Sequence, residues 1–270
     1  MEPSLEEIFG SYMSWKLDDQ TWIINFMAGT ENMYLLEGDE KALLIDTGYG
    51  AGNLRDYVEK LTDKPIVVAN THYHPDHAAG NGEFEQVYMS KNAELDKATM
   101  TDTPFDLTKL PHPDYEKIYV GDGNTIELGN RTIEILDIKP AHCNSSLFFL
   151  DRSHRMFFCG DDMEAAQVNL FNVDYDLKTV LDNFLENTER ILSLSTEFDY
   201  LLPNHNGAPI AKSYLNDYID LVHAIYNKEV EPDEKLNHRY IEMDPKAPQL
   251  CRVRGKNGSI ITYREQLKNL

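Results

Sequence analysis

The stretch THYHPDHAAGN, residues 71–81, concentrates metal-binding side chains more than any other part of the sequence. It holds three of the nine histidines of the chain within six positions. His72 and His74 are two residues apart, so in an extended segment both side chains leave the same face of the backbone and can converge on one point. The spacing predicts that these two imidazoles bind a common metal ion.

Two further ligands follow directly in the same stretch. Pro75 favours a change of backbone direction, and the adjacent Asp76 and His77 can then aim at a second point a few ångströms away. Neutral imidazole and carboxylate are the ligands that zinc and neighbouring metals accept. The stretch therefore predicts a metal site with room for two ions.

Four ligands in one loop cannot enclose two metals, so other strand ends must supply more. Three residues stand where such ligands are expected: His142 in KPAHCNSS, Asp161 in CGDD and His205 in PNHNG. Each follows an apolar run and is surrounded by turn-forming residues, so a rigid scaffold can present it at a strand tip. The other histidines, His112, His154, His223 and His238, lack these surroundings and are predicted to be surface or core residues.

The hydrophobic pattern predicts an alternation of strands and helices. Runs such as TWIINFM, KALLID and PIVVAN predict buried strands, and apolar residues at three- and four-residue intervals predict helices near residues 177–192 and 215–225. Residues 101–115 are rich in Pro and Asp and predict a long loop, which either lines a pocket or is an ordinary surface insertion. The pieces RYIEM, QLCRV and SIITY predict short strands near the carboxyl end.

Length and charge set the limits on function. The 270 residues suit one large domain, expected over residues 1–228, with an extension over residues 229–270 packed on it. The formal charge of −21 disfavours nucleic acid as a partner, because its phosphates are bound by Lys and Arg. No apolar run is long enough for a membrane span, and three widely spaced cysteines argue against a disulfide framework. We expect a cytoplasmic protein that binds neither nucleic acid nor membrane.

Taken together, these motifs resemble those of the metallo-β-lactamase superfamily. The residues THYHPDH match the HxHxDH signature, and IDTG at residues 45–48, the later His142, the GD of Gly160 and Asp161, and His205 follow in the same order. The similarity runs from about Tyr34 to Gly207. It implies an α/β fold in the form of a four-layer αββα sandwich, in which two mixed β-sheets are flanked by helices and a dinuclear metal site lies at one edge of the sheets.

The resemblance also implies a role for each ligand. By this likeness the first metal is bound by three histidines, the second metal by Asp76 and two histidines, and Asp161 bridges them. The two histidine sets are His72, His74 and His142 for the first metal, and His77 and His205 for the second. Asp46, in IDTG, is expected to orient a ligand loop without binding metal itself.

Three departures from the family pattern narrow the expected activity. Zinc β-lactamases carry Cys or Ser where Asp161 stands, so the bridging carboxylate points toward glyoxalase II, lactonases and related enzymes. The sequence after the signature is AAGN instead of a Gly-Gly pair, and the third-histidine loop is AHCNSS, which puts Cys143 beside the metal as an additional ligand or as a buried apolar residue. Asp162 competes with Asp161 for the bridging role.

The ligand set predicts a metal-dependent hydrolase. Two divalent ions, zinc by expectation with manganese or iron as alternatives, would hold a bridging hydroxide that attacks a small ester, lactone or thioester, and Asp76 would act as the catalytic proton acceptor. Two alternatives remain open: an iron-dependent oxidoreductase of the sulfur dioxygenase type, and a phosphodiesterase. The expected partner is a small-molecule substrate, and the family resemblance is compatible with a homodimer.

Overall fold

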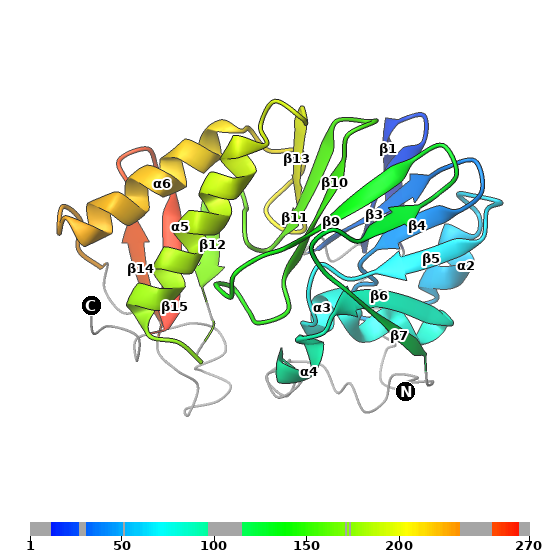
Figure 1. Cartoon of the computed structure of the whole chain (residues 1–270), viewed down its shortest axis with the longest axis horizontal. Coiled ribbons are helices and arrows are strands. Elements are labelled where there is room, and N and C mark those ends of the chain that lie inside the picture. The colour runs from blue at the N-terminus through cyan, green and yellow to red at the C-terminus, as the bar shows by residue number, and fades with distance from the viewer. Residues whose placement is uncertain are drawn as a thin grey trace, which may run out of the picture. The chain divides into compact units, whose positions relative to one another are not determined.

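The computed structural model describes residues 12–26, 31–50, 52–96, 115–170, 172, 174–232 and 250–264. They belong to two compact units, which Figure 1 shows as ribbons. Unit 1 comprises Met1–Asp137 and Ser145–Phe158, and unit 2 comprises Ile138–Asn144 and Cys159–Leu270. Most of the predicted 101–115 loop, the piece RYIEM and the residues His112 and His238 lie outside the described residues.

Unit 1 is built around a seven-stranded mixed sheet. Its strands stand in the order β1-β2-β3-β4-β5-β6-β7; neighbours are antiparallel from β1 to β4 and parallel from β4 to β7. The strands are β1 (Tyr12–Asp18), β2 (Thr21–Phe26), β3 (Asn32–Glu37), β4 (Ala42–Ile45), β5 (Ile66–Ala69), β6 (Gln86–Ser90) and β7 (Glu116–Val120). The runs TWIINFM, KALLID and PIVVAN, predicted as strands, form β2, β4 and β5, whereas β1 and β7, at the two edges, were not predicted.

Short helices cover one face of this sheet (Figure 1). They are α2 (Leu54–Val58), α3 (Pro75–Ala78), the 3-10 helix η1 (Ala79–Glu83) and α4 (Ala93–Asp96). Leu54 and Val58 of α2 are fully buried in one apolar cluster with Leu44 of β4 and Val68 of β5. Burial of this cluster is the main term that stabilises the layer, because the free energy gained scales with the apolar area removed from water.

A second, antiparallel set of strands completes unit 1. It consists of β8 (Thr125–Glu127), β9 (Thr132–Asp137), β10 (Leu147–Asp151) and β11 (Met156–Gly160), paired in the order β8-β9-β10-β11. Arg131, between β8 and β9, is fully buried and donates to Asp151 Oδ2 at 2.6 Å and to the carbonyl oxygens of Gln20 and Glu37. One guanidinium therefore ties this set to the strands of the first sheet.

Unit 2 combines two long helices with a small sheet. Helix α5 (Leu177–Ser193) is capped by Asp176, whose side chain accepts from the Thr179 N–H. It packs against α6 (Ser213–Tyr226) through Phe184 and Tyr218. The three-stranded sheet has the order β12-β15-β14, formed by β12 (Gln167–Leu170), β14 (Leu250–Arg254) and β15 (Ile260–Arg264). The predicted helical stripes and the pieces QLCRV and SIITY are confirmed as α5, α6, β14 and β15.

Strand β13 (Tyr200–Pro203) completes the elements of unit 2. The described parts of the chain contain no helix that is long and apolar enough to cross a membrane. The division into a 1–228 domain and a 229–270 extension stays a prediction.

Candidate metal centre

The HxHxDH segment begins where a buried strand ends. Strand β5 stops at Ala69, and an irregular stretch with a bend at Thr71 leads to His74, which precedes Pro75 at the first position of α3. Proline fits that position, because its missing N–H would have no helical partner there. The N–H of Leu147, at the start of β10, donates to the Thr71 carbonyl at 2.7 Å. The ligand segment is thus held by both strand sets of unit 1.

His72 is oriented by its neighbour Thr71. The Thr71 hydroxyl donates its single proton to Asp46 Oδ2 at 2.6 Å, so its oxygen is left to accept from Nδ1–H of His72 at 3.1 Å. Nε2 of His72 therefore carries a lone pair and lies 3.1 Å from Nδ1 of His74. Two ligands of a tetrahedral zinc stand about 3.3 Å apart, given metal–nitrogen bonds of about 2.05 Å. The two imidazoles have the separation that one cation requires.

His77 is oriented by Asp46 from the opposite side of the ring. Its Nδ1 lies 3.0 Å from Asp46 Oδ2, and its Nε2 lies 3.7 Å from Asp76 Oδ2. His77 and Asp46 are almost completely buried, whereas the Asp76 side chain is 22% exposed. A carboxylate that accepts from one ring nitrogen leaves the other nitrogen for a metal, which is the usual arrangement of metal-binding histidines. Unit 1 thus brings together the four predicted ligands of the signature.

Buried amides hold the backbone behind these ligands. The His77 carbonyl accepts from the N–H of Thr47 at 2.8 Å and from the side-chain amide of Asn70 at 3.2 Å. Asn81 exchanges hydrogen bonds with Asn70 and accepts from the Thr47 hydroxyl. The sequence offers no signal for this network, because Thr47 lies far along the chain from Asn70, His77 and Asn81.

In unit 2, Nδ1 of His142 is also held by a hydrogen-bond acceptor of the protein. Nδ1 lies 2.6 Å from the carbonyl oxygen of Asn169 in β12, and since a carbonyl only accepts, Nδ1 is the protonated nitrogen. Nε2 therefore keeps its lone pair and lies 3.7 Å from Asp161 Oδ2. Strand β15 supports this contact, because Asn169 pairs with Thr262 in the parallel β12–β15 ladder.

Asp161 lies between two histidines of unit 2. The same oxygen, Oδ2, stands 3.3 Å from Nε2 of His205 and 3.7 Å from Nε2 of His142. Asp162 accepts the backbone N–H of His142 through Oδ1 at 3.4 Å. Asp161 directly follows β11 and His205 follows β13 by two residues, as predicted for strand-tip ligands. Of the two competing carboxylates, only Asp161 belongs to a metal-capable group among the described residues.

Negative charge gathers around these residues of unit 2. Burial, and then the charges of Asp162, Glu164 and Asp161, raise the pKa of the Cys159 thiol well above its usual value. Carboxylates held together at low exposure favour a bound cation, since its charge offsets their mutual repulsion.

Other residues considered from the sequence lie outside these groups. His154 contacts Ser153 and Gln20, His223 is exposed on α6, and neither belongs to a metal-capable group among the described residues. The same holds for Cys143, which is 3% exposed, and none of the three buried cysteines forms a disulfide. The structure agrees with the predicted surface or core role of these two histidines.

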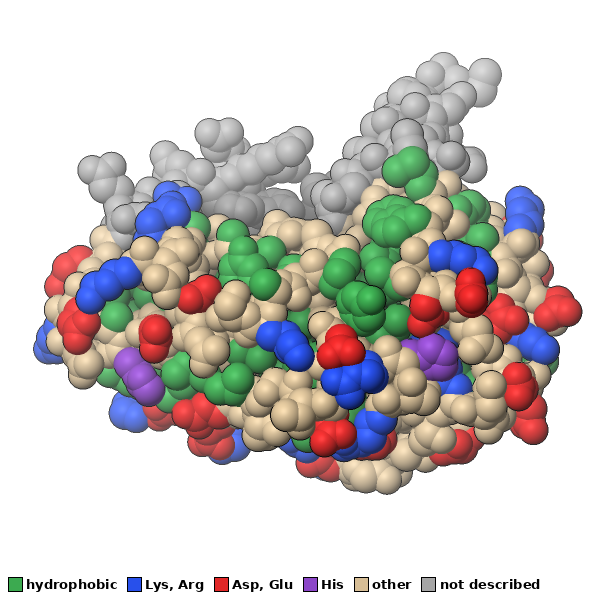
Figure 2. All heavy atoms as spheres, turned by 90° about the horizontal axis from the view of Figure 1, so that it is seen from above, with side chains coloured by type: hydrophobic (Ala, Val, Ile, Leu, Met, Phe, Trp, Pro, Cys, Tyr) green, Lys and Arg blue, Asp and Glu red, His purple; other side chains and the backbone are tan. Residues whose placement is uncertain are grey.

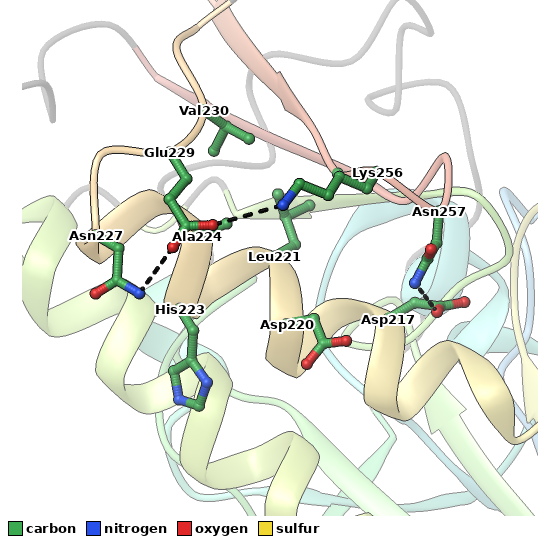
Figure 3. Close-up of a pocket in the computed structure, with 11 residues that line it drawn as sticks. Asp217, Asp220, Leu221, His223, Ala224, Asn227, Glu229, Val230, Lys256 and Asn257 are labelled. Atoms are coloured by element: carbon green, nitrogen blue, oxygen red, sulfur yellow. Dashed lines mark hydrogen bonds and ion pairs between the residues drawn. The ribbon is translucent and has the colours of Figure 1, made fainter.

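An open surface pocket in unit 2 is a separate feature (Figure 3). It lies between α6 and the turn from β14 to β15, where Lys256 pairs with Glu229 at 3.7 Å and Asn257 donates to Asp217 at 2.7 Å. None of the predicted ligands lines it. On the face shown in Figure 2, acidic and basic side chains of the described residues are interspersed, as expected of a solvated surface.

The donor sets of the two units fit a metal. In each unit imidazole Nε2 atoms approach a carboxylate oxygen while the remote nitrogens of His77 and His142 are held by protein acceptors. The histidine and aspartate clusters are consistent with a metal site typical of the family described below. Asp46 contacts Thr71, which directly precedes the HxHxDH segment, and His77, which ends it.

Comparison with known proteins agrees with these observations. The acyl-coenzyme A thioesterase MBLAC2 of Gallus gallus is 23% identical over 203 residues, 64% of this chain and 72% of that protein. The hydroxyacylglutathione hydrolase of Hyphomonas neptunium is 29% identical over 124 residues, 46% of this chain and 43% of that protein. The structure of a metallo-β-lactamase from Pontibacter korlensis matches with a TM-score of 0.62 and 19% identity, over 79% of this chain and 99% of that one.

The fold expected from the sequence is confirmed by this match: a mixed α/β metallo-β-lactamase fold with two main sheets and helices. The model of the metallo-β-lactamase superfamily matches residues 27–186, more than half of the chain. That range contains the HxHxDH segment, His142 and Asp161. The chain belongs to the metallo-β-lactamase superfamily.

Proposed function

We propose that this protein is a dinuclear metal-dependent hydrolase that cleaves small acyl thioesters. The observation that carries the proposal is the orientation of His77 and His142: Asp46 and the Asn169 carbonyl hold their Nδ1 atoms, which leaves both Nε2 atoms for metal. A structural histidine needs no such arrangement on two different segments.

The proposal assigns seven ligands to two ions. Asp161 would be shared between the ions. The first ion would be held by His72, His74 and His142, and the second by Asp76, His77 and His205. Zinc is the proposed metal, because imidazole suits it and two metals that share a carboxylate are common in hydrolytic sites.

When bound, the metals would supply Lewis acidity, which polarises the acyl carbonyl and lowers the pKa of water near neutrality. Asp76 would ligate through one carboxylate oxygen and use the other as proton acceptor. Its 22% exposed side chain can meet the attacking water, take up a proton, and return it to the departing thiolate. The products are a carboxylic acid and a free thiol.

The relatives support an acyl thioester as the substrate. Both hydrolases described above are named for acyl groups carried on coenzyme A or glutathione, which are thiol carriers. The formal charge of −21 favours a carrier of low charge over coenzyme A, whose phosphates this protein would repel. Small esters and lactones would be secondary substrates.

The test combines metal analysis with a substrate panel. We expect protein purified without added metal to contain about two zinc or manganese ions per chain and to hydrolyse thioesters faster than lactones, esters and phosphodiesters. Asp76→Ala should abolish the activity, whereas His223→Ala, which changes an exposed histidine of α6, should retain it. One iron per chain with thiol-dependent oxygen uptake would instead identify an oxidoreductase and overturn the proposal.

A further inference from the structure

Two loops of unit 2 are joined by a pair of hydrogen bonds that enclose the candidate ligands Asp161 and His205. The Asn204 N–H donates to the Gly160 carbonyl at 3.2 Å, and the Asn206 side-chain amide donates to Oε2 of Glu164. Asp161 lies between Gly160 and Glu164 on one loop, and His205 lies between Asn204 and Asn206 on the other. Along the chain, the bonded residues therefore flank Asp161 and His205, whose Oδ2 and Nε2 atoms are 3.3 Å apart.

We infer that Glu164 is a positioning residue that holds His205 in place through Asn206. The inference rests on the proposed function, in which Asp161 and His205 bind metal. Glu164 itself would not bind metal; its carboxylate would set the distance between the two loops.

Glu164 is well anchored for this role. It is 1% exposed, and its carbonyl accepts from the hydroxyl of Tyr218, a fully buried residue of α6, at 3.2 Å. The preceding carbonyl, of Met163, accepts from Cys159 Sγ at 3.3 Å. Helix α6 and the end of β11 therefore hold the Glu164 backbone, and its side chain can transmit that rigidity to the neighbouring loop.

Asn206 is the residue on the His205 loop that needs such support. It has a φ of +58°, which residues other than glycine rarely adopt, and asparagine is among the residues that tolerate it best. Asn206 is an exposed residue, and the adjacent Gly207 also has a positive φ of +91°. The bond to Glu164 is an interaction that fixes this turn directly after His205.

The presence of a carboxylate at position 164 also supports the positioning role. Asp161 and Asp162 are also buried, at 6% and 3% exposure, so a third carboxylate nearby adds repulsion and a desolvation cost. An apolar residue would fill the same space at lower cost if packing were the only requirement. A carboxylate is the stronger acceptor for an amide N–H, because charge-assisted hydrogen bonds are shorter and stronger than neutral ones.

The decisive variant is Asn206→Gly, measured by metal titration of the whole protein against a chromophoric chelator. Glycine adopts a positive φ without strain, so the fold is retained while the amide donor is lost. We expect the wild type to bind two zinc ions, and Asn206→Gly to bind one ion with unchanged affinity and the other about 10- to 100-fold more weakly, as found when groups that orient metal ligands are removed.

Lys228→Gly is the matched control. Lys228 has a φ of +56° just beyond the end of α6 and belongs to neither loop, so the substitution also places glycine at a positive-φ position but removes no bond to Glu164. It should bind both ions as the wild type does. If Lys228→Gly also loses the second ion, chain flexibility and not the Glu164 contact is responsible, and the inference is wrong.

Two substitutions of Glu164 complete the test. Glu164→Gln keeps an acceptor oxygen, so it should bind both ions with affinities within about threefold of the wild type. Glu164→Leu has no acceptor and should resemble Asn206→Gly. Wild-type affinity for both ions in Asn206→Gly overturns the positioning role alone. A wild-type protein that binds no divalent metal overturns the proposed function as well, so the two failures are distinguishable.

Discussion

Nδ1 of His77 lies 3.0 Å from Oδ2 of Asp46, and the two side chains are 0% and 1% exposed. Asp46 also accepts from the backbone N–H of Thr71 at 2.7 Å and from its hydroxyl at 2.6 Å. One buried carboxylate thus orients His77 directly and His72 through Thr71. Asp46 lies outside the HxHxDH segment, so a side chain that is predicted not to bind metal itself contacts the candidate ligand His77 and its neighbour Thr71.

Asp46→Asn should weaken metal binding without unfolding the protein. The amide keeps one acceptor oxygen but places an NH₂ group against Thr71 or His77, which both need an acceptor. We expect the affinity for metal to fall about 10- to 100-fold, measured by titration with a competing chelator. Unchanged affinity for both ions would show that Asp46 does not orient the ligands.

Thr71→Val isolates the path from Asp46 to His72. Valine has the shape of threonine but lacks the hydroxyl, so His72 loses the acceptor of its Nδ1–H while the contact of Asp46 with His77 remains. One of the two ions should bind about tenfold more weakly, and Thr71→Ser should restore it. Equal losses in the valine and serine variants would contradict this path.

Gly80→Ala should destabilise unit 1 by crowding. A Cβ at this position would stand 2.4 Å from the Thr47 carbonyl oxygen and 3.0 Å from its Cβ. The backbone would have to move, at a cost of about 1–3 kcal/mol in the free energy of unfolding, measured by urea denaturation. Gly123→Asn is the control, because no atom lies within 4 Å of a Cβ there and asparagine tolerates its φ of +82°.

Arg131→Met should be among the most destabilising single substitutions in unit 1. It leaves the Asp151 carboxylate buried without the guanidinium that donates to it at 2.6 Å, and such a change costs about 3–5 kcal/mol. Urea denaturation followed by circular dichroism measures the loss. Adding Asp151→Asn to Arg131→Met should recover part of it, because no unpaired charge then remains. A double variant no more stable than the single one would contradict this account.

The same ion pair predicts a stability that depends on pH. Burial opposes ionisation of Asp151, but the Arg131 charge and hydrogen bonds from Ser153 and His154 outweigh it and hold the Asp151 pKa below its usual value. The pKa of Asp151 in the folded protein is thus below the unfolded value of about 3.9. The charged Asp151 therefore stabilises the fold fully above about pH 4, and this stabilisation is lost as the pH falls through the folded pKa. The stability difference between wild type and Asp151→Asn should therefore shrink on acidification below about pH 4. A constant difference would assign the effect of Asp151 to packing instead.

Much of the fold was predictable because a strand that is buried on both faces of a sheet has a nearly continuous apolar sequence. The runs TWIINF and ALLI are apolar almost throughout and form β2 and β4, the inner strands of a sheet. Strands β1 and β7 were missed, since edge strands carry exposed and charged residues and depend on pairing with a distant partner. Tyr12–Asp18 has alternating exposure, and Glu116–Val120 pairs with β6 across a long insertion.

The amino-acid sequence alone identified four candidate metal ligands in unit 1, because His72, His74, Asp76 and His77 fall within six positions and the local chain brings them together. The family pattern extended this prediction to His142, Asp161 and His205, each just after a strand. Tertiary structure decided what no spacing reveals: that Asp46 and the Asn169 carbonyl select Nε2 of His77 and His142, and that Glu164 contacts Asn206. These contacts join residues 27 to 42 positions apart, and only the packing of strands and helices around a common core brings such residues within hydrogen-bonding distance.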